Sequence, residues 1–323
     1  MKRSIRVLII CLLLVSLSGL VHAADEGYFI LIGDLHCHSD FSHDSDVLIE
    51  QVVEESGVAG YDFLSITDHN TVRHMTKDYS TDEVLVMAGY EHTTQAAHVN
   101  IFGLRYVPRK SAIYTLGDME EYLRPLREQG AYIQLDHPND SLYYSRFGYD
   151  MEMDFLEVWN GVWREDDHKT LNDWHDMIVA GRYIPATGGT DAHGNHARRN
   201  VFNHVYVQEK REGAILEALA AGRNFVTRYV DSPIISSECD GEIMGGTVDY
   251  HEGQAVTIKI ANLRSGLTLK VYSNQGLYFE DVHEAGGDYT LSLETTSVDF
   301  FRVELWASDK AMEAFSNPIF IRH

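Results

Sequence analysis

From about residue 28 to residue 230, short apolar runs alternate with longer segments in which apolar residues recur every three or four positions. A short apolar run between turn residues is typical of a buried strand, and the longer period is typical of an amphipathic helix. Their alternation predicts βα units and a mostly parallel sheet or barrel. The expected strands are 28–34, 63–67, 84–90, 99–104, 131–136, 155–159 and 183–188, and the expected helices are 47–56, 118–129, 169–180 and 212–221.

After Pro233 the pattern changes to a strict alternation of apolar and polar residues. Period two in short stretches, with turn residues between them and no helical pattern, predicts antiparallel strands. The alternating stretches are 256–260, 267–271, 289–293 and 301–305. We therefore expect residues 24–232 to form the α/β domain and residues 233–323 to form a small antiparallel β-sandwich.

The first 23 residues have the composition of a secretory signal peptide. Three basic residues lie within the first six positions, an apolar run follows over 7–15, and Val21 and Ala23 occupy the small-residue positions of a cleavage site. The apolar run is shorter than the roughly 20 residues that a membrane-spanning helix needs. We expect cleavage near Ala23 and export to the periplasm or the extracellular space, with no stable membrane span in the mature chain.

Acidic residues far outnumber basic ones. The 49 Asp and Glu residues against 26 Lys and Arg residues give a formal net charge of -23. A protein that holds a polynucleotide by its phosphates needs a basic surface, so this balance disfavours a polynucleotide partner. A small anionic or ester substrate is compatible with it, because bound divalent ions would reverse the local potential.

His, Asp and Glu side chains follow the expected strands at five places. The C-terminal ends of parallel strands meet at one edge of the fold, where α/β proteins carry their chemistry. Five such strand ends therefore predict one wall of metal ligands. The motifs are Asp34-Leu-His-Cys-His38, Thr67-Asp-His-Asn70, Gly89-Tyr-Glu91, Leu135-Asp-His-Pro138 and Gly189-Thr-Asp-Ala-His193.

The spacing within these motifs favours shared ions. His36 and His38 are two residues apart on one strand and so point to the same face. Glu91 is a carboxylate that could bridge two ions, and Asp191 and His193 repeat the spacing of two. Imidazole and carboxylate ligands together suit Zn, Mn or Fe better than Ca or Mg. The candidates outnumber the three or four protein ligands that one zinc ion takes, so we expect two or three divalent ions.

These motifs resemble the polymerase and histidinol phosphatase (PHP) superfamily of metal-dependent phosphoesterases, from Asp34 to about Thr227 and in the family's order. The resemblance implies a distorted, TIM-like seven-stranded βα barrel with a trinuclear metal cleft at its C-terminal rim. It also assigns ligands to three ions. The first would take His36, His38, Glu91 and Asp191, the second Glu91, His98 and His137, and the third His69, His193 and one more ligand from the first motif.

The first motif departs from the family at that additional ligand. The family commonly has Ser-Asp-Gly, with the Asp as ligand, where this chain has Ser42-His43-Asp44. His43 aligns without a gap and some members use His there, so His43 is our expected ligand and Asp44 the alternative.

Weaker features narrow the resemblance further. The expected signal peptide, the run Glu157-Val-Trp-Asn-Gly161, the run Gly222-Arg-Asn-Phe-Val-Thr227 and a C-terminal β-domain are similar to exported members grouped with carbaryl-type metallohydrolases.

The reaction that we expect is metal-assisted hydrolysis of a small phosphate mono- or diester, with Glu91 and Asp191 at the reacting centre. Asp68 precedes a ligand histidine, as Asp136 does. It could orient an imidazole, transfer a proton or only stabilise the fold. Arg198 and Arg199 follow the last motif and could stabilise charge on the leaving side, or they could be an ordinary solvated pair.

Two other functions stay open at this point. A hydrolase of carboxyl or carbamate esters could use the same site and would act on aryl esters but not on aryl phosphates. A catalytically idle protein could instead bind envelope glycans or a partner through its β-domain.

Overall fold

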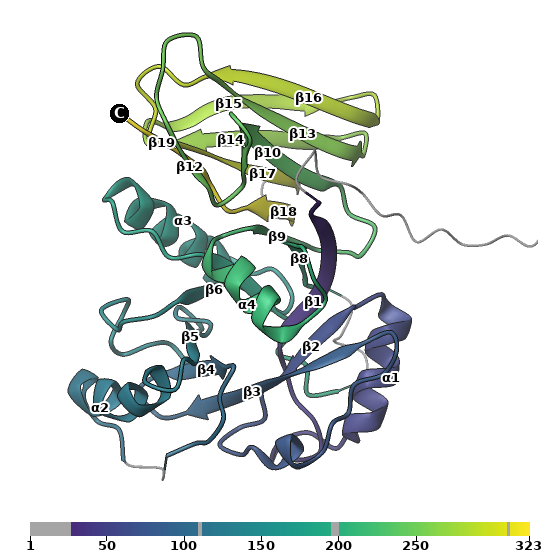
Figure 1. Cartoon of the computed structure of the whole chain (residues 1–323), viewed down its shortest axis with the longest axis vertical. Coiled ribbons are helices and arrows are strands. Elements are labelled where there is room, and N and C mark those ends of the chain that lie inside the picture. Colours follow the sequence, from purple (N-terminus) through teal and green to yellow (C-terminus); the bar gives the residue numbers. More distant parts are fainter. Residues whose placement is uncertain (1–26, 109–111, 195–199, 309–310) are drawn as a thin grey trace, which may run out of the picture.

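The computed structural model describes residues 27–108, 112–194, 200–308 and 311–323, which form a mixed α/β fold around one large sheet (Figure 1). The expected signal peptide lies outside the described residues. None of the helices in the described ranges has the length and apolar character needed to cross a membrane.

Seven strands follow one another in the large sheet in chain order. They are β1 (Phe29–Cys37), β2 (Phe63–Ile66), β3 (Leu85–Thr93), β4 (His98–Phe102), β5 (Tyr132–Leu135), β6 (Phe155–Asn160) and β7 (Ala186–Gly189). Neighbours pair in parallel except at β4, which is antiparallel to β3 and β5. Each strand falls on a run that the sequence predicted.

The chain beyond β7 returns to β1. The Asp191 amide donates to the His36 carbonyl at 2.7 Å, and the His38 amide donates to the Ala192 carbonyl at 3.1 Å. The first and last of the predicted ligand motifs are therefore joined directly through their backbones.

Within the described residues, helices are fewer than a regular alternation of strands and helices requires. They are α1 (Ile49–Ala59), α2 (Leu116–Arg127), α3 (Glu165–Val179) and α4 (Glu212–Ala220), each overlapping one of the four expected helices. The described link between β2 and β3 holds only a 3-10 helix, Arg73–Thr76, and the link between β5 and β6 holds no helix. Local signals still set the helix ends: Thr115 and Asp118 form a capping box at the start of α2.

The large sheet continues past the expected domain boundary at residue 232. Strand β8 (Phe202–Val207) pairs antiparallel with β1, β9 (Asn224–Thr227) with β8, and β18 (Ala311–Ser316) with β9. The C-terminal strands form a layer at one end of the molecule, with α1 and α2 at the other (Figure 1).

The C-terminal region divides its strands between two sheets. A four-stranded sheet has the order β11-β10-β13-β16, and the other strands extend the large sheet. The remaining elements are β10 (Ile234–Cys239), β11 (Glu242–Ile243), β12 (Thr247–Asp249), β13 (Ala255–Leu263), β14 (Leu267–Ser273), β15 (Gly276–His283), β16 (Gly287–Glu294), β17 (Phe300–Ser308) and β19 (Ile319–Arg322). Most pairs are antiparallel, and β12 with β19 is parallel.

Asn317 ties the C-terminal region to β7. Its buried side chain accepts a hydrogen bond from the Ala186 amide at 2.8 Å and donates to the Ala186 carbonyl at 2.9 Å and the Asn224 carbonyl at 3.0 Å. A buried side-chain amide that forms hydrogen bonds with the backbones of two strands fixes the position of one strand relative to the other. The C-terminal region thus holds the strand that leads to the last ligand motif.

Asp167 gives the fold a pH-dependent element at the start of α3. Its carboxylate oxygens accept hydrogen bonds from the backbone amides of Asn160 at 2.9 Å and Arg164 at 2.6 Å. Burial of this side chain raises its pKa to about 7 despite these hydrogen bonds. Folded Asp167 therefore stays protonated at pH values where an unfolded aspartate is ionised.

Stability should therefore fall as pH rises through this range. The contribution of Asp167 is fully present below about pH 4, where the unfolded aspartate is also protonated, and it is lost as pH approaches 7, by about 2 kcal/mol between pH 5 and 7. Asp167→Asn is neutral at every pH and lacks this loss, so its stability deficit relative to wild type should shrink from pH 5 to pH 8. Thermal unfolding of both proteins in chelator measures the deficit, and a constant deficit would contradict the raised pKa.

Candidate metal centre

The predicted ligands gather at the strand ends of the large sheet. They come from β1 (His36), the residue directly after β1 (His38), the turn after β2 (His69), β3 (Glu91), the start of β4 (His98), the turn after β5 (His137) and the segment after β7 (Asp191 and His193). Their ligand atoms form overlapping groups whose members lie within 4.8 Å of one another. A cleft of about 400 Å³ opens over them.

Glu91 lies at the middle of the cluster and is fully buried. Its Oε1 is 2.7 Å from His98 Nδ1, and its Oε2 is 2.8 Å from His69 Nδ1. The same Oε2 is 3.4 Å from Nε2 of both His36 and His38. Burial opposes the charge on Glu91, but hydrogen bonds from the surrounding imidazoles outweigh it and hold the pKa of Glu91 well below its usual range.

Asp191 supplies a second carboxylate, which faces His36 and His38. Its Oδ1 is 3.1 Å from His38 Nε2 and 3.3 Å from His36 Nε2. Burial again opposes ionisation, and the imidazoles of His36 and His38 outweigh it and keep the pKa of Asp191 well below its usual range. Both carboxylates are therefore ionised and directed at the same two imidazoles.

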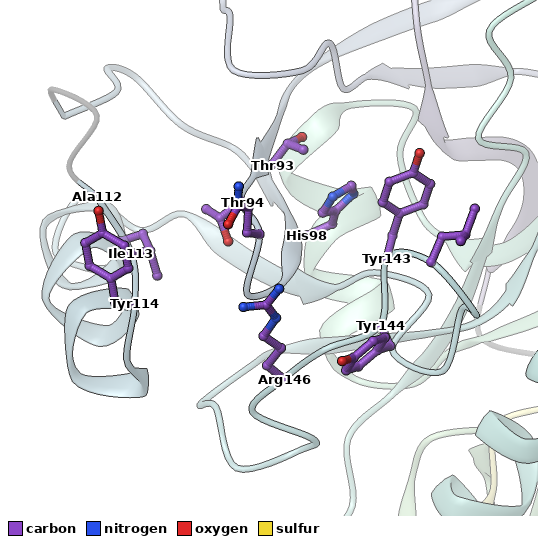
Figure 2. A pocket seen from close by; sticks show the side chains of 11 residues that line it. Thr93, Thr94, His98, Ala112, Ile113, Tyr114, Tyr143, Tyr144 and Arg146 are labelled. Carbon is purple, nitrogen blue, oxygen red and sulfur yellow. The ribbon is translucent and has the colours of Figure 1, made fainter.

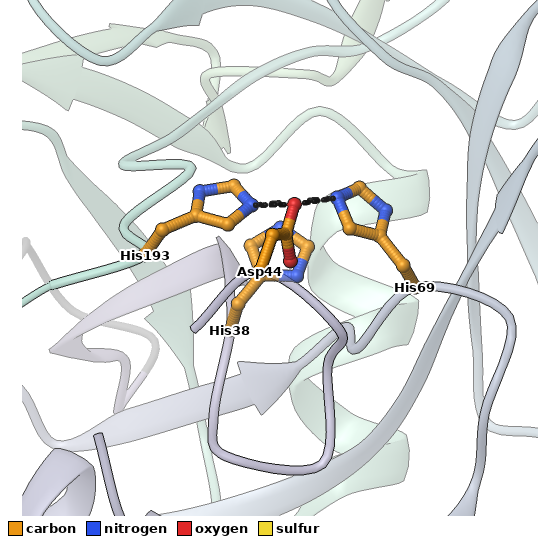
Figure 3. A group of neighbouring side chains, drawn as sticks. All are labelled: His38, Asp44, His69 and His193. Carbon is orange, nitrogen blue, oxygen red and sulfur yellow. Dashed lines mark hydrogen bonds and ion pairs between the residues drawn. The ribbon is translucent and has the colours of Figure 1, made fainter. Parts of the chain in front are cut away.

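A third group consists of His38, Asp44, His69 and His193 (Figure 3). Asp44 Oδ2 is 3.1 Å from Nε2 of both His69 and His193, and these two nitrogens are 3.3 Å apart. Nitrogen lone pairs and a carboxylate oxygen that converge in this way are the donor set of an imidazole and carboxylate metal site.

The structure places Asp44 in this group and His43 outside it. The His43 side chain is 74% exposed, and its Nδ1 lies 3.9 Å from Asp44 on the rim of the cleft. Ser42 explains the difference, because its hydroxyl donates to Asp44 Oδ1 at 2.8 Å and accepts from the His69 amide at 3.2 Å. The turn thereby directs Asp44 inward, so our choice of His43 over Asp44 disagrees with the geometry.

Backbone strain accompanies three of the strand ends. Asn70, His137 and Asp191 have φ values of 55°, 25° and 49°, a region that side chains other than glycine seldom adopt. Strained backbone of this kind is concentrated at functional sites, where the surrounding structure enforces it. Here it turns the chain directly after a strand and points the neighbouring ligands into the cleft.

The donor atoms present fit divalent metal ions. His137 Nδ1 and Asp136 Oδ2 are buried and have no hydrogen-bond partner among the described residues. A buried polar atom without a partner is costly, and metal ligation would satisfy it. His137 also shares one donor group with Glu91 and His98 and another with His36 and Asp191. The mixture of imidazole and carboxylate donors is suited to Zn, Mn or Fe.

Glu157 contacts two of the predicted ligands, and no sequence pattern predicted these contacts. Its Oε1 is 2.9 Å from His36 Nδ1, and its Oε2 accepts from the His137 amide at 2.9 Å and from Asn160 Nδ2 at 3.1 Å. A carboxylate on the second nitrogen of a ligand histidine fixes its tautomer and orientation. Gly189 makes room for this pair, since a Cβ there would lie 2.2 Å from His36 Cβ and 2.5 Å from Glu157 Oε1.

Asp68 contacts the loop after β1 and belongs to none of the donor groups. Its oxygens accept from the Ser39 amide at 2.7 Å and the Ser39 hydroxyl at 2.8 Å, and His74 Nδ1 lies 3.3 Å away. These contacts match the stabilising role considered for Asp68. Arg198 and Arg199 lie outside the described residues.

Known proteins share this fold. The PHP domain family model matches residues 34–136. A two-domain protein from Bacteroides vulgatus that contains a predicted PHP-like metal-dependent phosphoesterase is 18% identical, with a TM-score of 0.53 over 91% of this chain and 96% of that one. The match confirms the PHP resemblance over residues 34–136, and the Bacteroides structure shows a similar mixed α/β fold.

Two further solved structures are more distant. The lesion-specific endonuclease PfuEndoQ from Pyrococcus furiosus is 18% identical, with a TM-score of 0.47 over 59% of this chain and 56% of that one. PsfC from Pseudomonas syringae is 14% identical, with a TM-score of 0.48 over 62% of this chain and 92% of that one. No curated protein sequence matches the chain significantly.

Metal content distinguishes Asp44 from His43 as the ligand. Asp44→Ala should bind about one equivalent of metal fewer than wild type after reconstitution, because the third group loses its carboxylate, whereas His43→Ala should keep the wild-type content. Elemental analysis of the three proteins, with circular dichroism to check folding, gives the answer. Metal loss in His43→Ala with full content in Asp44→Ala would reverse the assignment.

Proposed function

We propose that this protein is an exported, metal-dependent phosphoesterase that hydrolyses a small phosphate mono- or diester. The observation that carries the proposal is the cluster of ligand atoms around the buried carboxylate of Glu91, at the strand ends of a PHP-like fold. The similarity to carbaryl-type metallohydrolases is part of the same proposal.

The donor groups support a centre of two or three metal ions. His36, His38, Glu91 and Asp191 would hold the first, Glu91, His98 and His137 the second, and His38, Asp44, His69 and His193 the third. When bound, divalent ions of this kind lower the pKa of water and polarise the oxygens of a phosphate ester. In the overall reaction the water oxygen bonds to phosphorus, the bond to the alcohol oxygen breaks and the alcohol leaves with a proton.

The protein's own contribution is to hold the metal ligands in fixed positions. Glu157 fixes His36, and Asn160 links Glu157 to Asp191, because its Nδ2 is 3.1 Å from Glu157 Oε2 and 3.3 Å from Asp191 Oδ2. Thr93 supports His69, since its hydroxyl lies 2.5 Å from His69 Nδ1. Ligands held by such outer contacts need little reorganisation during the reaction.

The remaining predicted residues have supporting roles in this proposal. Asp68 would stabilise the loop that carries Asp44, and Arg198 and Arg199 would stabilise charge on the leaving side. The size of the cleft, about 400 Å³, and the net charge of -23 favour a small substrate over a polynucleotide.

The proposed architecture is a distorted seven-stranded βα barrel over residues 24–232 and an antiparallel β-sandwich over residues 233–323. The chain order of β1 to β7 supports the barrel, as do two backbone hydrogen bonds, from the Asp191 amide to the His36 carbonyl and from the His38 amide to the Ala192 carbonyl. One apolar core that includes residues of both C-terminal sheets, such as Ile258 and Val303, supports the sandwich. The composition of residues 1–23 supports export with cleavage near Ala23.

A hydrolysis screen on the mature protein tests the function. An aryl phosphate monoester, an aryl phosphate diester, an aryl carboxyl ester and a single-stranded oligonucleotide are compared after chelation and after addition of Zn, Mn or Fe. We expect turnover of a phosphate ester that disappears on chelation and returns with metal. Glu91→Ala should lower kcat by about 100-fold or more, because it loses the carboxylate shared by two donor groups.

Arg124→Gln, on the outer face of α2, serves as the control, and circular dichroism checks that each variant folds. Turnover of the aryl carboxyl ester alone would identify a carboxyl or carbamate ester hydrolase. Cleavage of the oligonucleotide alone would replace the small substrate with a polynucleotide. No turnover of any substrate by the metal-loaded protein would favour an idle binding protein.

A further inference from the structure

A second cavity of about 590 Å³ lies beside the metal cleft (Figure 2). Three segments line it: the turn between β3 and β4, the residues before α2, and the loop after β5. It shares Thr93, His98 and Tyr143 with the metal cleft. His98 is also a candidate ligand, so the cavity adjoins the metal cleft directly. A group attached to an ester in the metal cleft would extend past His98 and Tyr143 into this cavity.

Aromatic side chains dominate the open face of this cavity. Tyr114, Tyr143 and Tyr144 line it and are 81%, 57% and 52% exposed, and Leu142 beside them is 76% exposed. Tyr143 also faces His98, with 5.3 Å between ring centroids. Large exposed aromatic rings next to the metal cleft favour contact with a flat apolar group of a ligand.

Arg146 places a positive charge in the same cavity. Figure 2 shows its guanidinium directed toward the middle, with Tyr114 on one side and His98 and Tyr143 on the other. No carboxylate of the described residues forms an ion pair with Arg146, although the chain has 49 acidic residues. An exposed guanidinium that forms no ion pair with the described residues can bind a carboxylate or phosphate of a ligand through two parallel hydrogen bonds.

The loop after β5, which carries Tyr143, Tyr144 and Arg146, is held against the segments that carry the candidate ligands. The Arg146 amide donates to the Ala96 carbonyl at 2.7 Å, and the Ser145 amide donates to the carbonyl of Pro138, the residue after the ligand His137, at 2.9 Å. Asp140 Oδ1 accepts from the Tyr143 amide at 2.9 Å. These contacts therefore set the position of the loop relative to the ligands.

We infer that this cavity binds the alcohol part of the substrate, and that this part is an aromatic ring bearing a second anionic group, which Arg146 recognises. The inference rests on the proposed function and adds the substrate class to it. The aromatic ring lies against the tyrosines, and the anionic group, a carboxylate or a second phosphate, pairs with Arg146. Arg146 and Tyr143 are specificity residues in this account.

Three esters separate the contributions of the ring and the charge: methyl phosphate, phenyl phosphate and 4-carboxyphenyl phosphate. Ratios of kcat/KM are compared between variants, so that differences in leaving-group reactivity cancel. Arg146→Gln should lower the ratio of 4-carboxyphenyl to phenyl phosphate by about five- to tenfold, and Tyr143→Ala should lower the ratio of phenyl to methyl phosphate. The control Arg124→Gln should keep both ratios. The bisphosphate of hydroquinone, tested beside the carboxylate, shows which anion Arg146 prefers.

Binding of the leaving group is measured apart from turnover. Ligand-observed NMR on the metal-loaded protein should detect 4-hydroxybenzoate more strongly than phenol, and Arg146→Gln should remove the difference. Equal ratios and equal binding in wild type and Arg146→Gln would overturn the inference. Absence of turnover with every ester, together with Arg146-dependent binding of 4-hydroxybenzoate, would contradict the proposed phosphoesterase and retain the inferred binding site.

Discussion

The contact of one buried carboxylate, Glu91, with four imidazoles is the interaction on which the rest of the site depends. A carboxylate in the protein interior requires compensating positive charge or hydrogen bonds. Here the imidazoles come from the end of β1 (His36 and, directly after it, His38), from the turn after β2 and from β4. The contacts of Glu91 therefore bring the ends of these strands together at one edge of the sheet. The second carboxylate, Asp191, faces two of the same histidines and joins the end of β7 to this arrangement.

The parts of the fold distant from the cleft maintain this arrangement. Glu157 on β6 fixes His36 and the backbone of His137, and Asn317 in the C-terminal region fixes the start of β7. The C-terminal strands are therefore coupled mechanically to the ligand wall through β9, β18 and Asn317. A ligand set with such outer support can keep its geometry while substrate enters and leaves.

The gathering of His, Asp and Glu side chains at the strand ends was predictable from the sequence, because most of them belong to a local pattern, an apolar run followed by His, Asp or Glu; His98, at the start of β4, was assigned only through the family resemblance. The seven strands from β1 to β7 were predictable for the same reason. Asp44 was not, since its inward direction depends on the hydroxyl of Ser42 and on the amide of His69. The role of Glu157 depends on a contact with His36 across 121 positions, and the pairing of β18 with β9 is equally non-local. Short-range periodicity carries no information on either contact.

Elemental analysis of the purified mature protein, after reconstitution and removal of loosely bound ions, tests the central claim most directly. The overlapping donor groups around Glu91 predict more than one tightly bound equivalent of a transition metal per chain, and a marked decrease in Glu91→Ala with its circular dichroism retained. A content of at most one equivalent in wild type, or the same content in Glu91→Ala, would contradict the multinuclear centre.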